Sequence, residues 1–351
     1  MKKRILATIM AAMLAVTALA GCGGSAASSA AEAPKEEAAA DASSDPAVTI
    51  KLASTKATEN YMYKGMEKFK EIAEAESGGS ITVELYPASQ LGGQDEIVEG
   101  IQMGTIEAAF MTPSVAESFY AKSSIPSTLF LAKNEDHALK IWQSEYTAGI
   151  LEELKSALNV HCLDFAIEGA RNVWTIKEVT KLEDLKGVKL RVPGVPTFVS
   201  AFTALGCNPT TLAMAEIYTG LQTGIVEGLE NDTTSVLSNN FADHCKYCYK
   251  TNHGVSVMCF MVAESVWNSL TDAQRAALTK ASKDSADWLN SQYYVELENS
   301  EKTLKDMGVT FTTPTDEEFA KMQELLAPVI EEATKDLATK EELDALRALA
   351  D

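Results

Sequence analysis

The stretch GVKLRVPGVPTFVSAFTALGCNPTTLAMAEIYTGLQTGIVEGLEN spans residues 187 to 231 and contains one strand pattern and two helix patterns. Its first six residues alternate in polarity, as a half-buried strand does, and Arg191 lies on the face opposite the apolar side chains. Apolar residues at helical spacing follow Pro193, and they return at Ile217 and Leu221. A strand followed by covering helices is typical of an α/β fold.

The same order of elements precedes this stretch. Strands are predicted at 48–52, 81–86 and 106–111, and helices at 61–75 and around 97–101. Two successive α/β units in one chain predict two lobes that face a cleft.

Helical patterns also occupy the middle and the end of the chain. One helix is predicted from 142 to 154, followed by a strand at 161–166. Thr271 and Gln274 form the sequence of a capping box, and no Gly or Pro occurs between Thr271 and Gly308. A helix of about 36 residues is about 54 Å long, longer than one domain, so we expect it to brace both lobes. Two helices with an unmarked break are the alternative.

The N-terminus has the pattern of an export signal. Met1-Lys2-Lys3-Arg4 is followed by an uncharged run from Ile5 to Ala20, which is too short to span a membrane. Leu19-Ala20-Gly21-Cys22 resembles the lipobox of bacterial lipoproteins, which implies a signal peptide at 1–21 and a lipid on Cys22. A simple signal peptide cleaved near Ala20 is the alternative.

Residues 22–46 are rich in Ala, Ser, Gly and acidic residues and contain no aromatic side chain. Such a segment buries too little apolar area to offset its ordering entropy, so it is predicted to be a disordered tether. The tether and a lipidated Cys22 would hold the protein at the outer face of the cytoplasmic membrane.

The composition is that of a globular protein with a strong negative charge. Hydrophobic residues make up 46% of the chain, and removing the three basic residues of the signal from a total of 30 leaves 27 against 50 acidic residues, a charge of -23. This charge argues against nucleic acid and anionic lipid as partners. An anionic ligand therefore requires positive charge concentrated at one site.

Five cysteines remain besides Cys22, at positions 162, 207, 245, 248 and 259. An odd number in an exported chain does not indicate a disulfide scaffold. Cys245 and Cys248 lie near His244 and His253 and could form a zinc cluster, but their spacing matches no standard site. A local disulfide and buried thiols are the alternatives, and we predict no metal and no cofactor.

Arginine is rare outside the signal, occurring only at positions 171, 191, 275 and 347. Arg171 follows a predicted strand, and Arg191 lies near the carboxyl end of another, where ligands bind in open α/β sheets. The planar guanidinium offers a carboxylate two parallel donors, which lysine does not. A structural ion pair with one of the many acidic residues is the alternative for each arginine.

Several motifs match one transporter family. They are Leu185 to Pro193, Ala204 to Gly206, Glu216 to Tyr218, Leu221 to Gly224 with Glu230-Asn231, and, upstream, Tyr86-Pro87, Gln90 to Gly92 and Met103 to Thr105. With them, residues 190–231 resemble the signature region of solute-binding proteins of tripartite ATP-independent periplasmic (TRAP) transporters, the DctP-like family. The resemblance extends from about Val48 to the end. It implies an α/β Venus-flytrap fold like that of periplasmic binding proteins, with lobe I at 47–168 and 257–296 and lobe II at 169–256 and 297–351.

The resemblance also implies the ligand-binding residues. Arg191 resembles the arginine that forms a salt bridge with the ligand carboxylate, and Arg171 matches a second arginine that contacts the same group. Asn231 matches an asparagine that hydrogen-bonds the ligand, and Met214 occupies a position that lines the pocket. Thr55, Tyr63 and Thr112 fall where the first lobe reaches the cleft.

Two positions depart from the family pattern. Asp232 stands where many members have proline, so it either accepts a hydrogen bond from a ligand hydroxyl or amine, or caps the helix before Thr233. Thr112 stands where sialic-acid-type members carry a glutamate, which weighs against a sialic acid.

The expected function is the capture of a small carboxylate by hinge closure and its delivery to a small and a large membrane subunit driven by an ion gradient. A monomer is the expected oligomeric state. A ligand sensor that presents the closed form to a receptor is the alternative. An exported enzyme is a third class, but no G-x-S-x-G or H-E-x-x-H motif occurs.

Overall fold

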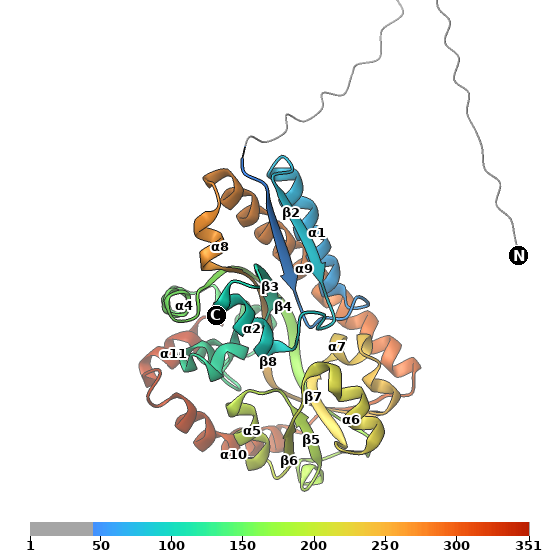
Figure 1. Ribbon diagram of the computed structural model, residues 1–351. Helices are drawn as coiled ribbons and strands as arrows, with labels where there is room; N and C mark the ends of the chain where they lie inside the picture. The colour runs from blue at the N-terminus through green and yellow to red at the C-terminus, as the bar shows by residue number, and fades with distance from the viewer. Residues whose placement is uncertain (1–44, 351) are drawn as a thin grey trace, which may run out of the picture. The chain divides into compact units, whose positions relative to one another are not determined.

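The computed structural model describes residues 45–350, so Cys22, the predicted signal peptide and nearly all of the predicted tether lie outside the described residues. The strands form one mixed sheet in the order β2-β1-β3-β8-β4-β7-β5-β6, with β9 added beside β8 (Figure 1). The strands are β1 (Val48–Ala53), β2 (Ile81–Tyr86), β3 (Ala108–Met111), β4 (Val160–Thr175), β5 (Lys189–Val192), β6 (Asn208–Thr211), β7 (Gly228–Asp232), β8 (Tyr247–Ala263) and β9 (Thr310–Thr312).

Strands β4 and β8 are antiparallel and belong to both lobes. Toward one end β8 pairs with β3, and toward the other end β4 pairs with β7. Strand β4 is much longer than the predicted strand at 161–166, because it continues through the polar residues Glu168, Arg171 and Asn172. These polar residues lie where the chain passes from one lobe to the other, and register shifts flank them.

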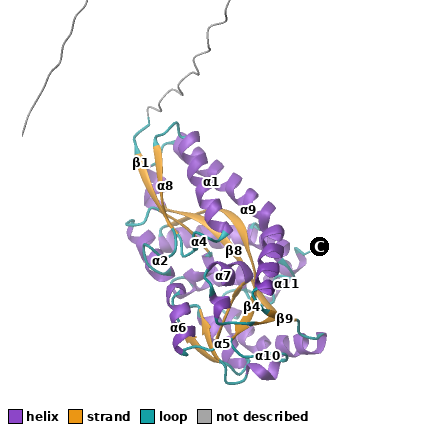
Figure 2. Cartoon of the chain, turned by 90° about the vertical axis from the view of Figure 1, so that its right-hand side faces the viewer, coloured by secondary structure: helices purple, strands orange, loops and turns teal. Residues whose placement is uncertain are grey.

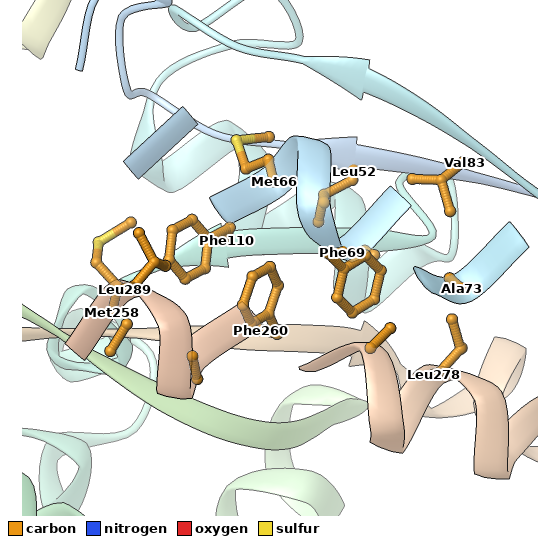
Figure 3. Close-up of a cluster of buried hydrophobic side chains, with 14 of the residues drawn as sticks. Leu52, Met66, Phe69, Ala73, Val83, Phe110, Met258, Phe260, Leu278 and Leu289 are labelled. Carbon is orange, nitrogen blue, oxygen red and sulfur yellow. The ribbon is translucent and has the colours of Figure 1, made fainter. Parts of the chain in front are cut away.

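Lobe I contains β1, β2 and β3, which are parallel in the pairs β1–β2 and β1–β3. Helices α1 (Tyr61–Glu76), α2 (Gln94–Met103), α3 (Glu135–Trp142), α4 (Glu145–Leu158) and α8 (Glu264–Ser269) surround them. Its core includes the stacked rings of Phe69, Phe110 and Phe260 (Figure 3). The ring centroid of Phe260 lies 4.7 Å from that of Phe69 and 4.2 Å from that of Phe110. Stacked aromatic pairs of this kind contribute about 0.5 to 1.5 kcal/mol each beyond the burial of their apolar area.

Lobe II contains β5, β6 and β7, with β5 parallel to both neighbours. Its helices are α5 (Pro196–Ala204), α6 (Ile217–Thr223), α7 (Thr233–Ser238) and α10 (Asp316–Thr334). Short 3₁₀ helices complete the connections of both lobes, at Pro113–Ser118 and Ala121–Ser127 in lobe I and at Leu182–Leu185, Met214–Glu216 and Phe241–Asp243 in lobe II. Met322 and Leu326 of α10 are fully buried against the lobe II core.

The long helix predicted after Thr271 is one continuous helix, α9 (Asp272–Asp306), and Thr271 and Gln274 form the predicted capping box. Leu278 and Leu289 pack into the core of lobe I, where α9 lies beside α1 (Figure 2). Leu304 packs into a core cluster of lobe II. The expectation that this helix contacts both lobes is confirmed.

Two segments differ from the sequence prediction. The helix predicted at 142–154 corresponds to α4, which starts later, at Glu145, because the Ser144 side chain accepts a hydrogen bond from Thr147 N and caps it, whereas Trp142 is the last residue of α3. Helix α11 (Lys340–Ala348) lies within the segment assigned to lobe II, yet Leu343 and Leu346 pack against Ile141 and Ile150 of lobe I. The C-terminal helix α11 therefore packs on lobe I.

Within residues 45–350, no helix combines the length and hydropathy needed to cross a bilayer.

Gly169 lies in β4 between the lobes with a φ of 138°, and a Cβ at this position would lie 3.0 Å from Tyr293 Oη. Gly169→Ala is expected to lower the free energy of unfolding by about 1 to 3 kcal/mol, because the backbone conformation suits glycine and the added methyl crowds α9. Urea denaturation measures the change.

Gly79→Ala is the matched control, since Gly79 also has a positive φ, 81°, but a Cβ there would meet open space. The control is expected to lose only about 1 kcal/mol. An equal loss in both variants would show that the contact with Tyr293 is unimportant.

Candidate ligand-binding site

A cavity of about 560 Å³, including the solvent at its mouth, lies where the two lobes and the crossing strands meet. Its walls come from lobe I, from lobe II and from β4 and β8. They consist of Thr55, Lys56, Gln94, Met111, Thr112, Ser114 and Val115; of Arg191, Pro193, Val195, Phe198, Met214 and Asn231; and of Glu168, Arg171, Ser256 and Met258. The mixture of apolar, hydroxyl and charged groups is typical of a site for a polar small molecule.

Arg191 lies near the carboxyl end of β5 and is only 3% exposed. Its Nε donates a hydrogen bond to the Leu212 carbonyl at 2.9 Å, and it has no ion pair with any residue in the range 45–350. Burial lowers the pKa of Arg191 to about 10, with Glu230 opposing and Arg171 reinforcing the shift, so the side chain is still a cation at neutral pH. A buried charge of this kind requires an anion.

Arg171 lines the same cavity but already has a partner. Its Nε and Nη2 donate to the two carboxylate oxygens of Glu230 at 2.6 and 2.7 Å, and its Nη1 donates to Ser256 Oγ at 3.0 Å. Its guanidinium also lies over the Phe198 ring, 5.3 Å from the centroid. Most of its N–H donors are therefore occupied, which fits the structural ion pair weighed for this residue.

Glu230 is fully buried beneath Arg171 and also lies 3.1 Å from His253 Nε2. Burial alone would raise the pKa of Glu230, but the charge of Arg171 and the hydrogen bonds from His253 and Arg171 outweigh it and lower this pKa. Burial lowers the pKa of His253, so its imidazole is neutral at pH 7. These side chains fix the arginine from behind the cavity.

Four other residues predicted to bind the ligand line the cavity, namely Thr55, Thr112, Met214 and Asn231. Asn231 Nδ2 lies 4.0 Å from Met214 Sδ, so these two side chains meet on the lobe II wall.

Two predicted residues lie elsewhere. Tyr63 is on α1 and packs against the lobe I core. Asp232 caps α7, since its Oδ1 accepts hydrogen bonds from Ser235 N at 2.9 Å and Thr234 Oγ1 at 2.7 Å. Of the two uses considered for Asp232, the structure therefore has the helix cap.

Sequence reasoning missed an ion pair in the cavity wall, between Lys56 and Glu168. Lys56 Nζ contacts Glu168 Oε1 directly and donates to Ser235 Oγ at 2.9 Å, and both charged residues are less than 5% exposed. Burial raises the pKa of Glu168, while the charge of Lys56 opposes the shift. The two side chains are in direct contact and form a buried ion pair.

The described cysteines are free thiols. Cys245 and Cys248 are buried, and burial raises the pKa of Cys245 to about 12. This arrangement corresponds to the buried-thiol alternative, because His253 is occupied by Glu230 and Thr251.

A family model described as bacterial extracellular solute-binding protein, family 7 (DctP), matches residues 52–336 of the chain. The chain belongs to this family. The assignment predicted from the motifs around residues 190–231 is thereby confirmed.

Relatives of this solute-binding protein are similar over most of their length. The C4-dicarboxylate-binding periplasmic protein DctP of Rhodobacter capsulatus is 30% identical over 292 residues, which cover 81% of this chain and 86% of the relative.

Solved structures of TRAP periplasmic solute-binding proteins share the fold. One from Pseudomonas putida F1, with bound D-glucuronate, has a TM-score of 0.80 and 26% identity, covering 86% of this chain and 96% of that one. Another from Roseobacter denitrificans, with bound L-galactonate, has a TM-score of 0.78 and 25% identity, covering 88% and 100%. The predicted two-lobed α/β fold is confirmed.

Proposed function

We propose that this solute-binding protein captures a small organic acid in the cavity between its lobes and delivers it to the membrane subunits of a TRAP transporter. The observation that carries the proposal is Arg191, a buried guanidinium that lines the cavity and has no anionic partner among residues 45–350. A ligand carboxylate would supply the missing charge and accept two parallel hydrogen bonds. The organic acids bound by the relatives support the same chemistry.

Contacts between the lobes support capture by closure. Lys56 of lobe I donates to Ser235 of lobe II, as described above. Glu117 of lobe I accepts hydrogen bonds from Thr197 N at 3.2 Å and Thr197 Oγ1 at 2.7 Å, at the first turn of α5 in lobe II. Breaking such contacts would open the cavity, and a ligand that touches both lobes would favour the closed form.

The delivery step rests on the family assignment. The membrane partners would be a small and a large subunit, and an ion gradient would supply the energy. A lipid on Cys22 and the tether at 22–46 would keep the protein, as a monomer, near these subunits on the outer face of the membrane.

A thermal-shift screen of the purified protein tests the proposal. The panel contains monocarboxylates, dicarboxylates, 2-oxo acids, sugar acids and aromatic acids, with neutral sugars and alditols as controls. A specific acid at about 100 times its Kd is expected to stabilise the fold by about 2.7 kcal/mol, which raises Tm by several degrees. Equal stabilisation by a neutral sugar and its acid would contradict carboxylate capture.

A further inference from the structure

The charged side chains around the cavity form a network that is almost completely paired. Its cations are Lys56, Arg171 and Arg191, and its carboxylates are Glu168, Glu230 and Asp232. All of them are 9% exposed or less. Their formal charges cancel, so the network as a whole supplies no surplus positive charge for a ligand.

The pairing nevertheless leaves one cation available. Arg171 is held by Glu230 through two hydrogen bonds, and Lys56 is held by Glu168. Arg191 has only the Leu212 carbonyl. One ligand carboxylate therefore has a cation to meet, and a second would have none.

Glu168 lines the cavity together with Arg191. One of its oxygens contacts Lys56, and no residue in 45–350 hydrogen-bonds the other. A ligand hydroxyl can donate to such an oxygen, whereas a ligand carboxylate would be repelled by it. Thr55, Thr112, Ser256 and Asn231 line the same cavity and are also suited to hydroxyl groups.

Asp232 also disfavours a second ligand carboxylate. It lies behind the cavity wall, and its carboxylate is held by Ser235 N and Thr234 at the start of α7. Burial would raise the pKa of Asp232, but the charge of Lys56 and these hydrogen bonds lower it, so Asp232 is ionised. Lys56 thus faces two carboxylates, and its positive charge is not free for a ligand.

We infer that Glu168 is a specificity-determining residue, which makes the site select monoanions bearing hydroxyl groups and reject dianions of the same size. This inference rests on the proposed capture of a carboxylate. Beyond carboxylate capture, the inference states that the end of the ligand opposite its carboxylate carries no charge.

Calorimetric titration with matched pairs tests the inference. The pairs are gluconate with glucarate, galactonate with galactarate, and 3-hydroxybutyrate with malate, which differ mainly in the second carboxylate. The wild-type protein is expected to bind the monoanion of the preferred pair about 100-fold more tightly, because like charges within a desolvated site repel strongly.

Glu168→Gln keeps the shape of the side chain and removes the carboxylate in direct contact with Lys56, so that Asp232 is the remaining carboxylate facing Lys56. We expect it to reduce the preference for the monoanion at least about tenfold, since Glu168 no longer repels the second carboxylate of the dianion and Lys56 attracts it. The double variant Glu168→Gln/Lys56→Met removes that cation and should restore much of the preference, which separates a charge effect from a loss of shape. Glu227→Gln is the control, because Glu227 forms an ion pair with Lys177 outside the cavity.

The outcomes separate the inference from the proposed function. Binding of a dianion as tightly as its monoanion by the wild-type protein, or an unchanged preference in Glu168→Gln, would overturn the role of Glu168 and leave carboxylate capture intact. Binding of neutral alditols in place of every acid would overturn carboxylate capture, and the inference with it.

Discussion

Arg191→Met is expected to weaken binding of the carboxylate ligand by about 100- to 4,000-fold. Truncating one partner of a buried charge pair costs about 3 to 5 kcal/mol, and each 1.4 kcal/mol is about a tenfold change in Kd. The ligand-free protein should lose little stability, because the substitution also removes a buried charge that has no ion pair within residues 45–350. Titration calorimetry measures the affinity, and urea denaturation measures the stability.

Arg347→Met is the matched control, since Arg347 pairs with Asp344 on the surface of α11, far along the chain from the cavity. It should bind the ligand as the wild type does. A purely structural role for Arg191 would give the opposite pattern, in which unfolding free energy falls sharply and the affinity of the remaining folded protein is unchanged.

Glu230→Gln is expected to lower the free energy of unfolding by about 3 kcal/mol, because it leaves Arg171 buried without its carboxylate partner. The double variant Arg171→Met/Glu230→Leu should lose less, since replacing a whole buried pair by apolar groups is often close to neutral. Urea denaturation of the single and double variants measures both effects. A single variant as stable as the wild type would contradict a structural role for this pair.

The same pair gives a dependence on pH. The pKa of Glu230 is lowered in the folded protein, against a value of about 4.3 in an unfolded chain. The stabilisation is therefore fully present above pH 4.3 and is lost as pH falls through the folded pKa. The difference in unfolding free energy between wild type and Glu230→Gln should shrink over that acidic range and stay constant near neutrality.

Local patterns predicted most of the fold. Alternation identified β1, β2 and β5, and the capping box at Thr271 identified the start of α9. The sequence predicts only the first part of β4, because the polar residues at the crossing between the lobes resemble a loop. The predicted start of α4 is three residues too early because apolar spacing includes Trp142, the last residue of α3, and continues across the break where Ser144 acts as a cap.

The sequence predicted several residues of the cavity but not the ion pairs among them. The position of Arg191 near the carboxyl end of a strand and its family motif predicted a ligand-binding residue, the family resemblance alone predicted Asn231 and Met214, and all three line the cavity. The ion-pair partners of the charged residues could not be predicted from the sequence, because Arg171 and Glu230 are 59 positions apart and Lys56 and Glu168 are 112 positions apart. The chain has 50 acidic residues, and the sequence does not show which of them become buried next to an arginine or a lysine.

The account depends most directly on the attraction between Arg191 and a ligand carboxylate. Titration calorimetry of the preferred acid and its primary amide, with wild-type protein and with Arg191→Met, isolates that interaction. The wild type should prefer the acid by about 100-fold or more, and Arg191→Met should bind acid and amide with similar affinity. Retention of the full preference for the acid in Arg191→Met would contradict the account.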